Sequence, residues 1–191
     1  MTDTTCSNTT NDTTEESIYL KKEDNLCNQL RKINLKLNSQ ISILLLNLIS
    51  ENELKNNYKE LLKKQKKCCF NLKQNTNISI GDFIYRILYY SKIEDSTLIS
   101  ALIYLDRYCK KQKIILTEYN IHRLFFTCIL VAIKFLEDKY FTNVFYSKIC
   151  GVKIGILNKM EYEFVCGINF DLYIDKSLYY KYENLLVNSI N

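Results

Sequence analysis

The 191-residue sequence contains no proline and only four glycines, Gly81, Gly151, Gly155 and Gly167. The turns of closely spaced strands draw heavily on these two residue types, so this small stock argues against a many-stranded sheet. Hydrophobic residues make up 47% of the chain, which is enough for a real core. The composition therefore favours an all-α protein with long helices, and the length suits one domain of about 100–150 residues plus extensions.

The sequence also lacks features of secretion and of membrane insertion. No basic segment followed by an apolar one begins the chain, and the longest apolar runs, 41–49 and 124–136, fall short of the roughly 20 residues of a spanning helix. No CxxC spacing occurs, and free cysteine in an apolar helix behaves as a small hydrophobe. The eight cysteines are Cys6, Cys27, Cys68, Cys69, Cys109, Cys128, Cys150 and Cys166. We therefore expect a reducing compartment, cytoplasmic and/or nuclear, and no membrane partner.

Positive charge lies mainly outside the most hydrophobic part of the chain. Residues 17–80 hold twelve Lys or Arg against five Asp or Glu, a balance of +7, whereas residues 81–175 hold twelve against eleven, a balance of +1. One lysine cluster could contact a polyanion, but no aromatic residues interleave with it, so a solvated helix face is the simpler interpretation. Its members are Lys59, Lys63, Lys64, Lys66 and Lys67. We therefore expect no nucleic-acid partner.

Hydrophobic periodicity divides the chain into four parts. Residues 1–17 form a polar tail that we expect to be disordered, and residues 18–78 form a helical extension and linker, with Leu30, Leu37 and Leu44 recurring every seven residues. Residues 79–172 contain five helical patterns, and residues 173–191 contain one more, over 176–188.

Capping residues predict where the five central helices begin and end. The first follows Ser79, the second runs from about residue 95 to 111, and the third is capped by Thr117 and ends near Asp138. The fourth is capped by Thr142 and stopped by Gly151, and the fifth spans about 154–166.

Charged residues occupy positions where these patterns predict burial. Lys134 lies in the apolar run 124–136, which is otherwise interrupted only by Thr127. Glu161 and Asp106 fall on the apolar stripes of the fifth and second helices, whereas Glu163 falls off the stripe and should face water. An unpaired buried ion is costly, so Lys134 should have a partner or reach an interface.

Acid–base catalysis is one possible use of these charges. Asp106 and Glu161 could act as paired carboxylates, but no nucleophile elbow, glycine-rich phosphate loop or metal-ligand cluster accompanies them. His122 is the only histidine, and zinc would need three thiolates at suitable spacing, which do not occur. We therefore expect no catalytic residue, no metal and no cofactor, which leaves a helical enzyme as the weakest alternative.

Several segments taken together resemble the cyclin box. They are Tyr104-Leu-Asp-Arg-Tyr108, Asn120-Ile-His-Arg-Leu124, Ala132-Ile-Lys-Phe-Leu-Glu-Asp138, Leu157-Asn-Lys-Met-Glu-Tyr-Glu-Phe164 and Gly167-Ile-Asn-Phe170. Each is weak by itself, but their order and spacing over about residues 79–172 are specific. The residues of these motifs are similar to those of the P-type cyclins of fungi and protists, which are related to the phosphate-starvation cyclins.

The resemblance implies a role for the buried charges. Cyclins carry a lysine late in the third helix and a glutamate in the fifth that together bind backbone groups of a cyclin-dependent kinase around its C-helix, and these positions match Lys134 and Glu161. Cyclins also hold an internal ion pair between the first and second helices, which matches Arg86 and Asp106. The implied function is that of a non-catalytic regulatory subunit, which binds and activates the kinase by positioning its C-helix.

One departure and one alternative accompany this resemblance. The stretch from Gly151 to Gly155 offers no serine or threonine to cap the fifth helix, although such a cap is common in these cyclins. The cyclin fold also serves as a scaffold or transcription-related adaptor, as in transcription-factor cores of the IIB type, without kinase activation. The nearly neutral charge of residues 81–175 argues against the DNA-binding form of that alternative.

Overall fold

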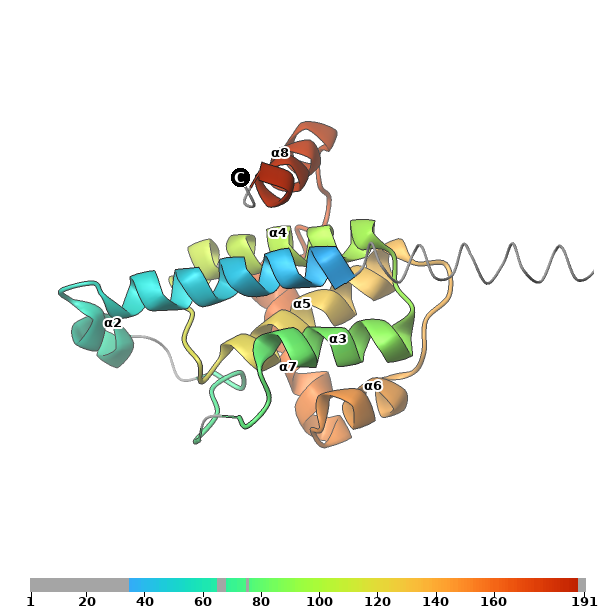
Figure 1. Ribbon diagram of the computed structural model, residues 1–191. Coiled ribbons are helices and arrows are strands. Elements are labelled where there is room, and N and C mark those ends of the chain that lie inside the picture. The colour runs from blue at the N-terminus through green and yellow to red at the C-terminus, as the bar shows by residue number, and fades with distance from the viewer. Residues whose placement is uncertain (1–34, 65–67, 75, 189–191) are drawn as a thin grey trace, which may run out of the picture. The chain divides into compact units, whose positions relative to one another are not determined.

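The structure is a computed structural model that describes residues 35–64, 68–74 and 76–188 (Figure 1). All the named helices lie in one compact unit that begins at residue 37. The predicted polar tail, the Leu30 position, and Cys6, Cys27, Lys66 and Lys67 lie outside the described residues. The described part is helical without strands, which confirms the all-α prediction. Its named helices are α2 (Tyr58–Lys64), α3 (Ile80–Ser91), α4 (Asp95–Gln112), α5 (Ile121–Leu136), α6 (Asn143–Cys150), α7 (Ile154–Gly167) and α8 (Lys176–Asn188).

Helix α5 forms the centre of the core. Twelve of its sixteen residues are buried, as its apolar sequence predicts. It packs against α3, α4, α6 and α7, which surround it (Figure 1). Because apolar side chains point from α5 in every direction, each neighbouring helix can bury one apolar face against it.

Helix α3 begins as the sequence predicts, whereas α5 begins later. Ser79 Oγ accepts a hydrogen bond from the Asp82 amide at 3.0 Å, so it is the N-cap of α3. Thr117 does not cap α5, whose N-cap position is Asn120. The Asn120 side chain instead ties the preceding turn together, because its Oδ1 accepts from the Thr117 amide and its Nδ2 donates to the Ile115 carbonyl, both at 2.9 Å.

The helices that follow α5 agree closely with the predicted bounds. Gly151 ends α6 with φ of +70°, a left-handed conformation that glycine adopts without strain. Lys153 occupies the N-cap position of α7 and makes no side-chain capping bond, in agreement with the lack of serine or threonine there. Helix α8 spans the predicted residues 176–188.

A helical segment over residues 37–53 packs on α3 and belongs to the same core. Its buried apolar side chains recur every four residues: Leu37, Ile41, Leu45 and Ile49. The described members of the predicted seven-residue recurrence both contact the core, since Leu37 is buried and Leu44 is partly buried against it. Asn38 Nδ2 donates to the Gly81 carbonyl at 3.1 Å, which joins this segment to the first turn of α3.

The end of α4 holds the chain that leaves α7. Arg107 donates to the carbonyl and the carboxylate of Asp171 and, at 3.1 Å, to the Tyr173 carbonyl. Lys111 Nζ donates to the Ile168 carbonyl at 2.8 Å, and Gln112 donates to the Gly167 carbonyl at 2.7 Å. Lys111 and Gln112 thus satisfy carbonyl groups that the end of α7 leaves without partners, whereas Arg107 holds the chain beyond it.

His122, the single histidine, fastens the segment before α3 to α5. Its Nε2 donates to the Ile78 carbonyl at 3.0 Å, and its ring packs edge-on against Phe83 at 5.3 Å between centroids. Burial lowers the pKa of His122 below its ordinary value of 6.5, although hydrogen bonds to backbone groups oppose the shift. The folded protein therefore favours neutral histidine.

We expect this burial to make the free energy of unfolding depend on pH. As the pH falls, the unfolded chain binds a proton at His122 near pH 6.5, whereas the folded protein binds it only at a lower pH. The contribution of neutral His122 to the free energy of unfolding is therefore complete above pH 6.5. It is lost as the pH falls toward the lower folded pKa. Urea unfolding between pH 7.5 and 5 should show a smaller loss of stability in His122→Gln than in wild type. Equal losses in the two proteins would contradict the assignment.

Candidate functional site

The buried lysine predicted from the sequence has an acidic partner. Lys134, in the last turn of α5, donates to Glu161 Oε1 of α7 at 2.6 Å. Their side chains retain 27% and 22% of their exposure, so the pair lies at the edge of the core rather than inside it. A lysine in the last turn also interacts favourably with the negative end of the helix dipole.

Asn143 completes the pair, and sequence reasoning missed it. From the first residue of α6, its Nδ2 donates to Glu161 Oε2 at 2.8 Å and to Asn158 Oδ1 at 2.9 Å. Glu161 thus accepts one bond at each oxygen, and three helices meet at one carboxylate. The Asn143 Oδ1 atom is buried without a hydrogen-bond partner, so this amide is held by its nitrogen alone.

Glu137 links the end of α5 to the start of α4. Its Oε1 accepts from the Thr97 hydroxyl at 2.6 Å and from the Glu94 amide at 3.2 Å. Helix α4 has no side-chain cap of its own, so Glu137 supplies a negative charge at its N-terminus from 40 residues away in the chain. The link fixes the backbone three residues after Lys134.

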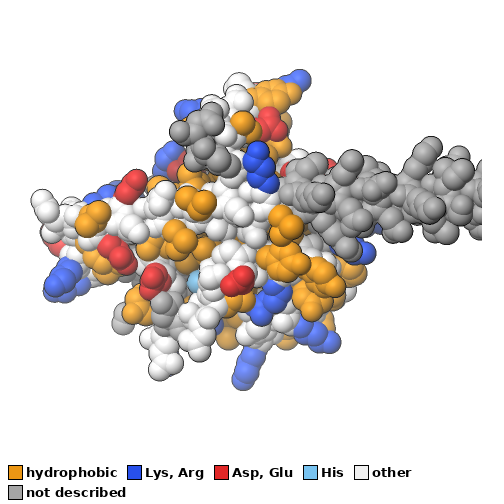
Figure 2. Space-filling model, viewed as in Figure 1, with side chains coloured by type: hydrophobic (Ala, Val, Ile, Leu, Met, Phe, Trp, Pro, Cys, Tyr) orange, Lys and Arg blue, Asp and Glu red, His pale blue; other side chains and the backbone are white. Residues whose placement is uncertain are grey.

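Apolar side chains that the core does not cover lie in the same segments as this pair. Exposed members of α5, of the loop that follows it and of α6 are Phe135, Leu136, Tyr140, Phe141 and Val144. Phe141 packs against Phe145, with 4.1 Å between ring centroids. Figure 2 shows hydrophobic side chains beside Lys and Arg over the region of α3 and α6. Apolar surface around a charged pair is typical of a protein-binding face.

The structure does not bring Arg86 and Asp106 together, so the ion pair implied by the resemblance is absent among the described residues. Asp106 Oδ2 accepts from Lys110 and from the Tyr182 hydroxyl of α8, both at 2.6 Å. Arg86 instead lies 5.3 Å from the ring centre of Phe83, and its buried Nε has no hydrogen-bond partner. The carboxylate thus binds α8, whereas the guanidinium lies against a ring of its own helix.

Glu163 also differs from its prediction. The pattern of α7 predicts that it faces water, but its Oε2 accepts from the Cys69 amide at 3.2 Å, and its Oε1 lies 3.8 Å from Lys159 Nζ. The contact secures the segment before α3 against α7. The helical pattern cannot reveal this contact, since the partner comes from 94 residues earlier in the chain.

In the described part of the chain, the two carboxylates considered as a catalytic pair do not come together. Asp106 and Glu161 are engaged in the separate bonds given above, and no group of three or more His, Cys, Asp or Glu among the described residues could hold a metal ion. Burial raises the pKa of Cys109 and Cys150 to about 12, so these thiols stay protonated at neutral pH. No described helix is both long enough and apolar enough to cross a membrane.

Comparison with known proteins agrees with this arrangement of helices. The family model described as Cyclin matches residues 4–172. Because that match covers most of the sequence, the chain belongs to the cyclin family, whose members are regulators without catalytic activity of their own.

The curated relatives found are plant cyclins. Cyclin-U4-2 of Arabidopsis thaliana is 39% identical over 114 residues, which are 59% of this chain and 53% of that protein. Cyclin-P3-1 of Oryza sativa subsp. japonica is 32% identical over 106 residues, 56% of this chain and 45% of that protein. The chain spans about half the length of these relatives. P-type names occur among them, but the expected likeness to fungal and protist cyclins is not supported.

Proposed function

We propose that this chain is the regulatory subunit of a cyclin-dependent protein kinase, of the P-type subclass, and that it acts in the cytoplasm and/or nucleus. The observation that carries the proposal is the half-buried pair of Lys134 and Glu161, set at the edge of the core among exposed apolar side chains. The predicted docking roles of these two residues rest on the cyclin resemblance together with this geometry.

The pair has hydrogen-bonding capacity left for a partner. An ammonium group has three donors and a carboxylate about four acceptor positions. Lys134 gives one donor to Glu161, and Glu161 accepts from Lys134 and Asn143. The remaining donors and acceptors can bind carbonyl and amide groups of a kinase backbone, while the apolar side chains around the pair exclude water.

The proposed mechanism is a shift of population in the kinase. An active protein kinase needs its C-helix placed so that the glutamate of that helix pairs with the catalytic lysine. A subunit that binds this placement more tightly than the inactive one favours the active state by its difference in affinity. The chain then needs no chemistry of its own.

The test is capture of a kinase from the native cell. We expect mass spectrometry to recover a protein kinase with the wild-type protein and not with Lys134→Ala/Glu161→Ala, because the double variant removes both docking groups without leaving either one unpaired. Circular dichroism should show that the variant keeps its helices.

Two outcomes would count against the proposal. Recovery of the kinase with both the wild type and the double variant would show that Lys134 and Glu161 are not needed for docking. Recovery of no kinase with either protein would favour the alternative, a cyclin-fold scaffold or transcription-related adaptor without kinase activation.

A further inference from the structure

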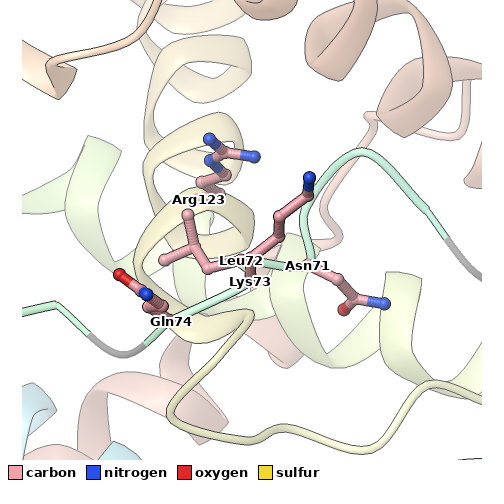
Figure 3. A pocket seen from close by; sticks show the side chains of 5 residues that line it. All are labelled: Asn71, Leu72, Lys73, Gln74 and Arg123. Atoms are coloured by element: carbon pink, nitrogen blue, oxygen red, sulfur yellow. The ribbon is translucent and has the colours of Figure 1, made fainter.

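A second group of cations lies away from the Lys134–Glu161 pair, where the segment before α3 crosses the first turn of α5. It borders a cavity of about 670 Å³ (Figure 3). The residues that line the cavity are Asn71, Leu72, Lys73, Gln74 and Arg123. The described residues of the lining therefore carry two positive charges and no negative one.

The walls of this cavity are fixed by hydrogen bonds. Arg123 Nη1 donates to the Cys69 carbonyl at 3.1 Å, and the Leu72 amide donates to the Tyr119 carbonyl at 2.8 Å. The bond from the Cys69 amide to Glu163 holds the same segment from its other side. A preformed wall lowers the entropic cost of binding a ligand.

The cations of the cavity lack an acidic partner among the described residues. Arg123 Nε is buried and makes no hydrogen bond, and neither Arg123 nor Lys73 forms an ion pair with any described residue. In Figure 3 the side chains of Lys73 and Arg123 extend to the same side of the 71–74 segment. A guanidinium with unsatisfied donors beside an ammonium group is an arrangement that binds phosphate strongly.

We propose that this cavity binds the phosphate group of a phosphorylated peptide. A phosphorylated serine or threonine carries nearly two negative charges and three acceptor oxygens, which match Arg123 and Lys73. The volume exceeds that of a phosphate group alone and falls in the range of about 300–1,000 Å³ typical of ligand sites. Asn71 and Gln74 supply amides for the backbone that flanks the phosphorylated residue, and Leu72 supplies an apolar contact.

The test is calorimetric titration of the full chain with the peptide Ala-Ala-phosphoserine-Ala-Ala, at constant ionic strength. The same peptide without phosphate and inorganic phosphate are titrated in parallel. Lys73→Gln removes one cation, and Lys181→Gln removes an equal charge from the exposed face of α8 as a matched control. Arg123→Lys keeps the positive charge and removes the planar guanidinium group with its paired N–H donors.

We expect saturable binding of the phosphopeptide by wild type, at least about tenfold weaker binding by Lys73→Gln and Arg123→Lys, and unchanged binding by Lys181→Gln. Weaker phosphopeptide binding by Arg123→Lys counts only if the amide NMR spectrum of this variant matches that of wild type. Lys73 is exposed, so Lys73→Gln tests the site without disturbing the fold. Equal weakening by Lys73→Gln and Lys181→Gln would overturn the proposal, as would equal binding of the unphosphorylated peptide. Inorganic phosphate binding as tightly as the phosphopeptide would overturn the peptide assignment.

Discussion

The charge-swapped variant Lys134→Glu/Glu161→Lys should keep the fold and lose the kinase. The exchanged side chains can still pair across α5 and α7, but Glu161→Lys removes the acceptor of Asn143 Nδ2, so we expect the free energy of unfolding to fall by about 1–2 kcal/mol. A kinase backbone would then meet an acceptor where it needs a donor and a donor where it needs an acceptor. Truncating one partner of a buried charged hydrogen bond costs an interface about 2–5 kcal/mol, so the kinase Kd should rise at least about 30-fold.

This variant separates a docking role from a structural one better than truncation does. The single variants Lys134→Glu and Glu161→Lys place like charges together and should be less stable than the swapped protein. Kinase affinity measured by surface plasmon resonance and stability measured by urea unfolding together decide the question. If the swapped protein bound the kinase as well as wild type, the pair would be structural only.

The second large effect is expected at Gly167, the last residue of α7. A Cβ atom there would lie 2.4 Å from Tyr108 Cε2. The Tyr108 ring is buried and stacks on Phe164 at 4.9 Å between centroids and 17° between planes, so it has little room to move. We expect Gly167→Ala to lower the free energy of unfolding by about 3 kcal/mol, the upper end for overpacking a dense core.

Gly155 provides a matched control in the same helix. A Cβ atom at Gly155 meets no other atom within 4 Å. Because alanine is the better helix former, Gly155→Ala should be neutral or should stabilise the protein by up to about 1 kcal/mol. Urea unfolding of both variants tests the argument, and equal effects at the two glycines would contradict it.

The helices could be predicted from sequence where a local signal decides them. Ser79 and Gly151 mark helix ends through their own side chain or backbone, and the apolar run of α5 indicates its central place. The predicted start of α5 is wrong because both Thr117 and Asn120 can cap a helix. Asn120 occupies the cap position, since its side chain also binds the turn before it.

The candidate site could be predicted only in part, because some of its residues are recognisable only through contacts that the fold creates. Lys134 and Glu161 are conspicuous because each interrupts an apolar pattern. Asn143 and Glu137 interrupt none, and they matter only through partners that the fold brings close. The expected pairing of Asp106 with an arginine of α3 is not found because α8 supplies Tyr182 as its partner, a contact that no local pattern in α4 can indicate.

The domain bounds and the docking roles stay predictions. The family match begins at residue 4, well before the predicted box at residue 79, and the segment 37–53 shares the core with the later helices. The core of the fold therefore includes residues that precede the predicted box.

The central position of α5 has a consequence for how this protein can transmit a signal. Four helices rest on α5, and none of them can swing outward without exposing apolar surface on itself and on α5. Partial openings are therefore costly, and the helices should move as one cooperative body. We therefore expect this protein to change its conformation little on binding, so that in any complex the partner undergoes most of the conformational change.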